Sequence, residues 1–169
     1  TSLYVHDFET GEDKKIKSGV FSAPTWHPNG KMIYYSRKPK LPNKNGSKFY
    51  DIYSFDLDNE KEQRLTYDLR AFSPVFIEQD SSIAYLATYD GGQDIYIFDL
   101  KSNNSKKITD FKDRPMISHL SYDKDLIKIY FDITKHHYRD IYSFDIASEE
   151  LEPVYQSVTF DERNLASRS

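Results

Sequence analysis

DIYSFDL at residues 51–57 returns as DIYIFDL at 94–100 and as DIYSFDI at 140–146. A weaker copy, LYVHDF, occupies residues 3–8. Each copy has a closing aspartate as its penultimate residue, and the steps from one to the next are 49, 43 and 46 residues. These aspartates are Asp7, Asp56, Asp99 and Asp145. A recurrence near this period is typical of folds that stack or radially repeat one supersecondary unit.

Each full repeat contains four short stretches of strand-forming residues. In the first repeat, VFSAPTW at 20–26 precedes the turn HPNG, whose Asn-Gly pair favours a tight hairpin. KMIYYS at 31–36 and the motif itself supply two more strands, and a short fourth strand follows near Leu65. Convincing 3.6-residue periodicity is absent, so we expect few helices.

The motif also indicates what surrounds its strand. Side chains alternate along a strand, so Ile52 faces one way while Tyr53 and Phe55 face the other. Apolar groups on both faces predict a sheet that is covered on both sides. Sheets packed radially as propeller blades meet this need, whereas a β-sandwich leaves one polar face on each strand. A sandwich and a β-solenoid are the alternatives.

The predicted fold is therefore all-β, a β-propeller of four-stranded antiparallel blades that occupies residues 1–169 as a single domain. Three complete blades are expected at about 20–66, 70–109 and 113–155, with partial blades at 1–17 and 157–169. Propellers have about 4–8 blades, so this number predicts a fragment or an incomplete ring. The further blades would come from the rest of a longer polypeptide or from another chain.

The stretch APTWHPNGKMIYYS at 23–36, followed by the motif and by RLT at 64–66, resembles the TolB-type propeller repeat. The resemblance extends over nearly the whole chain and weakens at 114–155, where the Trp and the Gly turn are missing. It implies a blade type rather than one function. Related blades occur in periplasmic TolB-like proteins, in peptidoglycan-binding envelope proteins and in the gating propellers of prolyl-oligopeptidase and tricorn-type peptidases.

Composition narrows the function classes. The net charge of −4 argues against general nucleic-acid binding, and no apolar run is long enough to predict membrane insertion. Cysteine is absent, which excludes disulfides and thiol catalysis. The envelope relatives implied by the resemblance favour a periplasmic or extracellular location, although nothing in the composition excludes the cytoplasm.

Positive charge concentrates in loops that join the second and third strands of the predicted blades. The loop at 37–48 has five cations and no acid, and the loop at 135–139 adds four more basic side chains. Loops held by a rigid scaffold often carry binding residues. The candidate partner-binding rim consists of Arg37, Lys38, Lys40, Lys44, Lys48, Lys135, His136, His137 and Arg139. The alternative is a solvated loop without a ligand.

No residue pattern singles out a catalytic, cofactor or metal site. His136 and His137 are adjacent and would point apart on an extended chain, with no acid pair nearby to complete a metal site. Residues 56–60 lack the glycine of a calcium loop, so the closing aspartates are expected to begin turns instead. We expect Trp26 to pack in the core between blades.

The function expected from the sequence is that of a non-catalytic TolB-like interaction module, with a protein or anionic polymer as its partner. Two alternatives remain. One is the substrate-gating propeller of a serine peptidase whose catalytic domain lies outside this chain, since no Gly-x-Ser-x-Gly elbow is present. The other is a carbohydrate-active propeller enzyme, which would need His and carboxylate side chains converging on the central channel.

Overall fold

The computed structural model describes residues 1–78, 81–135 and 138–156, and in this part of the chain all regular secondary structure is β-strand. Two strands, β1 (Ser2–His6) and β2 (Asp13–Ser18), form a small sheet. The first four-stranded sheet consists of β3 (Val20–Trp26), β4 (Met32–Arg37), β5 (Asp51–Asp56) and β6 (Lys61–Arg64).

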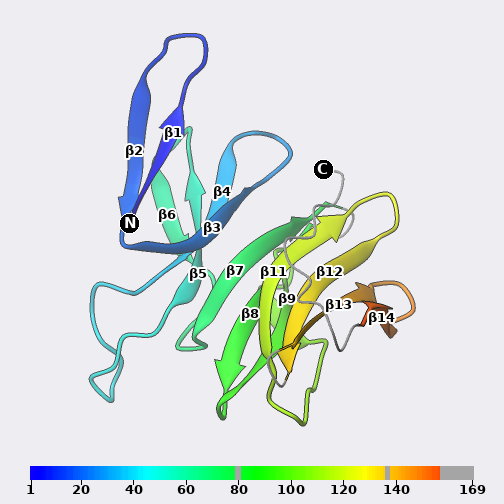
Figure 1. Ribbon diagram of the computed structural model, residues 1–169. Helices are drawn as coiled ribbons and strands as arrows, with labels where there is room; N and C mark the ends of the chain where they lie inside the picture. Colours follow the sequence, from blue (N-terminus) through cyan, green and yellow to red (C-terminus); the bar gives the residue numbers. More distant parts are fainter. Residues whose placement is uncertain (79–80, 136–137, 157–169) are drawn as a thin grey trace.

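Two further sheets repeat this order (Figure 1). The second consists of β7 (Ala71–Ile77), β8 (Ser82–Tyr89), β9 (Gly92–Asp99) and β10 (Asn104–Lys107). The third consists of β11 (Met116–Asp123), β12 (Lys128–Lys135), β13 (Tyr138–Asp145) and β14 (Leu151–Tyr155). All neighbouring strands are antiparallel, so each sheet is a meander.

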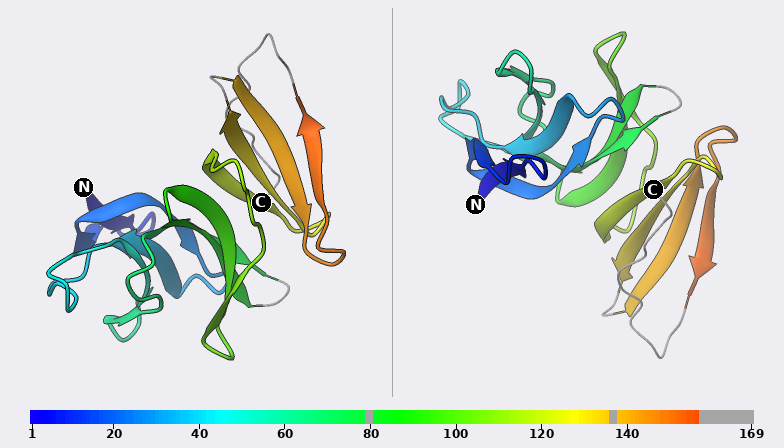
Figure 2. Two further views of the ribbon diagram at one scale, coloured as in Figure 1. Left: turned by 90° about the horizontal axis from the view of Figure 1, so that it is seen from below. Right: turned by 90° about the horizontal axis from the view of Figure 1, so that it is seen from above.

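The sheets stand beside one another as blades of an open arc rather than a closed ring (Figure 2). The predicted fold class, a propeller of four-stranded antiparallel blades, is confirmed. The first strands of the three sheets, β3, β7 and β11, are neighbours along the inner side of the arc and line a common groove. The expected partial blade at 157–169 lies outside the described residues.

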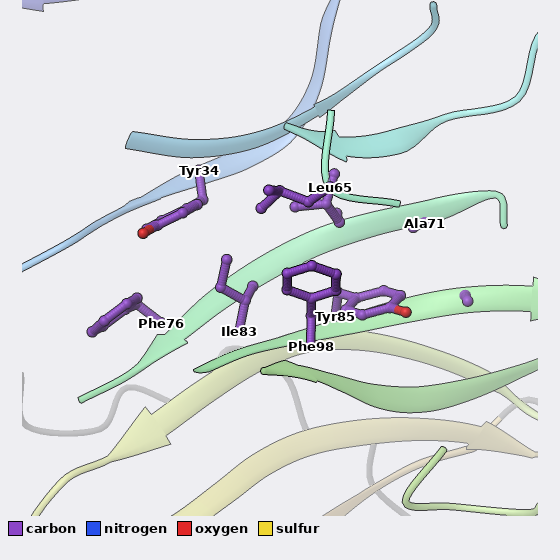
Figure 3. Close-up of a cluster of buried hydrophobic side chains, with 9 residues drawn as sticks. Tyr34, Leu65, Ala71, Phe76, Ile83, Tyr85 and Phe98 are labelled. Carbon is purple, nitrogen blue, oxygen red and sulfur yellow. The ribbon is translucent and has the colours of Figure 1, made fainter. Parts of the chain in front are cut away.

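The repeated strand is buried on both faces, as its sequence predicts. Ile52 on β5 belongs to a core shared with the second blade. Ile83 and Tyr85 of the second blade lie in this core together with Leu65 of the first (Figure 3). Tyr53 and Phe55 point the other way, into a core that also contains apolar residues of β1 and β2. Full burial of such a side chain stabilises the fold by roughly 1.5–3 kcal/mol, so these cores dominate the contact between blades.

The closing aspartates begin the turns between third and fourth strands. Oδ1 of Asp56 accepts hydrogen bonds from the backbone N–H groups of Asp58 at 2.9 Å and Asn59 at 3.0 Å. Asp7, Asp99 and Asp145 accept the equivalent pair of bonds. These bonds hold the pKa of each carboxyl below its usual value, in Asp56 together with the Asn59 side chain. The prediction that these aspartates form turns is confirmed.

The aspartate at the first position of the motif has a different structural role from the closing aspartate. Asp51 is fully buried, and its carboxylate accepts hydrogen bonds from Thr66 Oγ1 at 3.0 Å and from the backbone N–H of Leu69 at 3.2 Å. Arg64 completes the set at 2.6 Å. Asp94 binds Thr109 and the N–H of Phe111 in the same way in the second blade. The aspartate thus fixes the connection from each blade to the next.

Trp26 is placed differently from the sequence-based expectation. It is the last residue of β3 and is 45% exposed, so it does not pack in the core between blades. Its side chain lines a cavity with Pro28, Phe76 and Leu120 at the end of the groove formed by the inner strands. The expectation is wrong because an inner strand of a propeller has one face toward the channel, which the sequence alone did not distinguish from the packed face.

Candidate partner-binding site

A cavity of about 580 Å³ opens on the rim where the first two blades meet. Its apolar walls are aromatic rings, and three of its lining residues are cationic; no carboxylate is among them. We call it the basic cavity. The lining residues are Phe21, Lys38, Lys48, Phe49, Tyr50, Arg70, Phe72, Thr88 and Gln93.

The aromatic residues pack against one another and leave part of their surface open. The ring of Phe21 stacks on that of Tyr50 with centroids 4.4 Å apart and meets Phe72 edge-on at 6.0 Å. Phe21 is nevertheless 46% exposed. Exposed aromatic surface in a concave site is the usual anchor point of a protein or small-molecule ligand.

The cations of the basic cavity stand over these rings. The Lys38 ammonium lies 5.0 Å from the centroid of Tyr50, and the Arg70 guanidinium carbon lies 4.5 Å from that of Phe49. Both side chains belong to exposed residues, and in the described part of the chain neither makes an ion pair. A guanidinium above a ring keeps the N–H groups in its own plane available, which suits a carboxylate.

The position of Arg70 follows from the buried network around Asp51. Asp51 accepts hydrogen bonds from the backbone of Asp68 at 3.1 Å and of Leu69 at 3.2 Å, directly before Arg70. On the other side, the N–H of Ala71 donates to the carbonyl of Tyr50 at 2.7 Å. Arg70 itself has a positive φ of 52°, a conformation in which the backbone turns sharply. A buried network therefore aims the Arg70 side chain at the rim.

A second cavity, of about 390 Å³, adjoins the first, since Phe49 and Arg70 line both. It differs from the first in containing two carboxylates and two tyrosines, and we call it the acidic cavity. Its remaining lining residues are Asp68, Leu69, Ala87, Thr88, Tyr89, Asp90, Gly91 and Tyr96.

The structure separates the cations predicted for the rim. Lys38 and Lys48 line the basic cavity, and Lys40 and Lys44 are exposed on the same loop outside it. Arg37 is 8% exposed and donates hydrogen bonds to Glu62 at 2.8 and 2.6 Å, so its guanidinium is not presented to a partner. Arg37 therefore supports the blade rather than the rim surface.

Of the basic residues predicted in the third blade, Arg139 is described, and it is not among the residues that line the basic cavity. Lys135 ends β12, and Arg139 on β13 lies 3.5 Å from the carboxylate of Asp132. His136 and His137 lie outside the described residues. Binding by these four residues stays a prediction; of the described candidate rim residues, Lys38 and Lys48 line the basic cavity.

The sequence reasoning missed the aromatic half of the site and Arg70. Phe49 and Tyr50 directly follow the basic loop, and this neighbourhood of aromatic and basic residues was an available signal. Phe21 and Phe72 precede the prolines of two successive inner strands, so their convergence with Arg70 depends on how two blades are placed. That arrangement emerges only in three dimensions.

The inner strands form a separate groove of about 600 Å³. Each inner strand has a bulge with a residue at positive φ, namely Ser22, Ser73 and His119. Two groove hydroxyls join adjacent blades: Ser22 Oγ accepts the N–H of Ser73 at 2.9 Å, and Thr25 Oγ1 accepts that of Phe76 at 3.2 Å. These hydroxyls are therefore already engaged in holding the blades together.

His119 is the ionisable residue that lines this groove. Its Nδ1 lies 2.9 Å from Oδ1 of Asp132, and Ser118 Oγ donates to Oδ2 of the same carboxylate at 3.0 Å. This arrangement orients the imidazole, and it also fixes the bulge of β11. Among the described residues, no group of three or more His, Cys, Asp or Glu side chains is placed to hold a metal ion. The described part of the chain likewise contains no helix long and apolar enough to cross a membrane.

No family model matches the chain. A curated protein, the Tol-Pal system protein TolB of Ruthia magnifica subsp. Calyptogena magnifica, is 48% identical to it over 50 residues. These residues make up 30% of this chain and 10% of that protein. The match is thus high in identity but short.

Solved propellers extend the likeness to most of the chain. TolB from Acinetobacter baumannii has a TM-score of 0.67 at 21% identity, over 90% of this chain and 37% of that one. An oligogalacturonate lyase in complex with manganese has a TM-score of 0.69 at 12% identity, over 90% of this chain and 47% of the lyase. The propeller domain of the Trilobed protease from Pyrococcus furiosus has a TM-score of 0.63 at 20% identity, over 84% of this chain and 45% of that domain.

The chain spans less than half the length of each of these proteins. At such identities the structural likeness establishes the fold, and the functions of these proteins differ. The short curated match and the TolB structures agree with the repeated motif. The fold of this chain is that of a TolB-like β-propeller.

Proposed function

We propose that this chain is a non-catalytic interaction module whose rim binds an acidic segment of a protein partner. The observation that carries the proposal is the basic cavity, in which an open aromatic floor is flanked by Lys38, Lys48 and Arg70. The rings supply apolar contact area, and the cations select negative charge. Aromatic and arginine side chains are the residue types that most often dominate binding energy at protein interfaces.

A protein segment suits the cavity better than a uniform anionic polymer. The polar part of the wall is small beside the apolar part formed by Phe21, Phe49 and Phe72, so an occupant must also bring apolar surface. An aliphatic or aromatic side chain between carboxylates meets both needs. The curated relative is named as a protein of the Tol-Pal system, and an envelope setting, periplasmic or extracellular, fits a partner-binding role there.

An enzymatic role has weaker support. A carbohydrate-active enzyme needs several acid and base groups in the channel, and the groove offers His119 with Asp132, whose carboxylate also holds Ser118. A gating propeller for a serine peptidase would act through the channel, whereas the basic cavity opens on the rim between two blades. Both alternatives therefore leave the most distinctive surface of the chain unused.

The test is binding of a fluorescein-labelled peptide, acetyl-Glu-Glu-Phe-Glu-Glu-amide, measured by anisotropy at 50 and 200 mM salt. The double variant Lys38→Gln/Arg70→Gln removes two charges from the cavity, and we expect it to weaken binding about 10-fold or more. The matched control, Lys40→Gln/Lys44→Gln, removes two charges from the same loop outside the cavity. We expect this control to weaken binding by less than about threefold.

Two outcomes overturn the proposal. Equal losses in both double variants would reduce the effect to general attraction by a basic loop. Displacement of the peptide by trigalacturonate at lower concentration than by unlabelled peptide would make a carboxylated glycan the ligand. A peptide with Gln in place of Glu measures how much of the affinity depends on charge. A peptide with Ala in place of Phe measures how much depends on the aromatic ring.

A further inference from the structure

We infer that the acidic cavity binds a cationic side chain of the same partner segment, so that the recognised sequence is acidic on one side and basic on the other. This inference rests on the proposed function, because the two cavities adjoin: Phe49, Arg70 and Thr88 line both. A segment that occupies the basic cavity and continues past these shared residues enters the acidic cavity next.

The acidic cavity has the composition of a site for an ammonium or guanidinium group. Tyr89, Tyr96 and Phe49 present ring surface, and Tyr89 is 74% exposed on the turn between β8 and β9. Cations bind to the faces of such rings, most strongly where water is partly displaced. A volume of about 390 Å³ accommodates the end of a lysine or arginine side chain.

Of the two carboxylates in this cavity, Asp90 is the one available to a ligand. Asp68 lies 3.1 Å from Nη2 of Arg64, so it already has a cationic partner, which it shares with Asp51. Asp90 is exposed at the tip of the β8–β9 turn and makes no ion pair within the described residues. The residues that the two cavities do not share therefore differ in available charge: Lys38 and Lys48 line the basic cavity and Asp90 lines the acidic cavity, while Arg70 lines both.

This polarity gives a prediction opposite to that of a uniformly basic rim. Adding a lysine to an acidic peptide lowers its net negative charge, and general attraction to a basic surface would then weaken binding. A cation that enters the acidic cavity gains contact with Tyr89 and Asp90 and strengthens binding instead. The sign of the change therefore separates the two accounts.

The experiment uses the labelled peptide of the previous section extended by one, two or three glycines and a final Lys or Gln. With the best spacer, we expect the Lys peptide to bind about 3- to 10-fold more tightly than its Gln twin. The variant Asp90→Asn removes the charge and keeps a residue type that tolerates the positive φ of 48° at this position. This variant should bring the ratio of the two peptide affinities (Lys to Gln) close to one without changing the affinity of the Gln peptide.

The matched control is Asp125→Asn, which removes an exposed carboxylate from the β11–β12 turn at the opposite end of the blades. It should leave the ratio unchanged. A Lys peptide that binds no better than the Gln peptide with any spacer overturns the inference and leaves the proposed function standing. A preference for Lys that survives Asp90→Asn also overturns it. Failure of all the acidic peptides to bind overturns the proposed function itself.

Discussion

Arg37 on β4 and Glu62 on β6 form two hydrogen bonds, from Nε to Oε1 at 2.8 Å and from Nη2 to Oε2 at 2.6 Å, that pass over the intervening strand β5. The guanidinium also lies 4.4 Å from the centroid of the Tyr53 ring. Burial acts to raise the pKa of Glu62, but the bonds from Arg37 and Tyr35 outweigh it, so the pKa lies below its usual value. The pair is therefore ionised and integral to the first blade.

Removal of Glu62 leaves a buried, unpaired guanidinium. We expect Glu62→Gln to lower the free energy of unfolding by about 3 kcal/mol, measured by urea denaturation. Glu60→Gln removes an exposed carboxylate from the residue directly before β6. This variant should leave the denaturation midpoint close to that of the parent protein. The double variant Arg37→Met/Glu62→Leu should be more stable than Glu62→Gln. If the double variant is the less stable of the two, the unpaired charge is not the cause.

The threonines that follow β6 and β10 should contribute similarly to the stability of the first two blades. Thr66 Oγ1 accepts the N–H of Ile52 at 2.9 Å, and Thr109 Oγ1 accepts that of Ile95 at 2.9 Å. Thr→Val at either position leaves a buried N–H without a partner, which costs about 1–3 kcal/mol of unfolding free energy. Thr66→Ser keeps the hydroxyl and should recover most of this loss. Equal losses in the Val and Ser variants would assign the effect to packing.

Alkaline pH should destabilise the fold through buried tyrosines. Burial raises the pKa of Tyr85 to about 12, and the phenol donates a hydrogen bond to Ser105 at 2.8 Å. Between about pH 10 and 12 the unfolded state loses this proton while the folded state keeps it, so the stability present below pH 10 declines as the pH rises. The urea midpoint should therefore fall across this range, and more gently in Tyr85→Phe. Parallel curves for the two proteins would exclude Tyr85 as a contributor.

Phe21 offers a way to separate binding from folding. Its ring is 46% exposed at the floor of the basic cavity, so Phe21→Ala should change the denaturation midpoint little. The same variant removes the ring that stacks on Tyr50 and should weaken binding of the Phe-containing acidic peptide about 10-fold. As a control, Tyr67→Ala removes a ring that is 65% exposed outside both cavities and should not affect the peptide. Loss of binding in both variants would point to a diffuse surface effect.

Much of the fold could be predicted because the motif repeats a physical pattern. Ile52 and Tyr53 differ by one position and face opposite cores, which is what two-sided apolar alternation predicts. The turn function of Asp56 also followed from sequence, since Asp commonly bonds to the backbone two residues later. Trp26 could not be placed, because a strand that lines a channel and a strand that packs between blades use the same residue types.

The candidate site was predictable only in its charge. Lys38 and Lys48 stand in a visibly basic loop, but the pairing of Arg37 with Glu62 depends on strands 25 residues apart in sequence coming into register. Arg70 lies directly before β7 and Phe72 lies within it, and no local pattern relates them to Phe21. Long-range packing brings them together, which explains why loop composition identified the region and missed its aromatic half.

The exposure of the outer strands has a consequence for the order in which the chain opens. All four residues of β10 are exposed, whereas six consecutive residues of β8 are buried. Amide hydrogens should therefore exchange first along the outer edge of each blade and last along its middle strands. The residues that line the basic cavity come from β3, β7, β8 and β9, from the β4–β5 loop and, for Arg70, from the connection between β6 and β7; none belongs to β6 or β10. The cavity consequently keeps its shape while the periphery of the blades frays, and a bound segment should slow exchange at the centre of the arc and leave its margin unchanged.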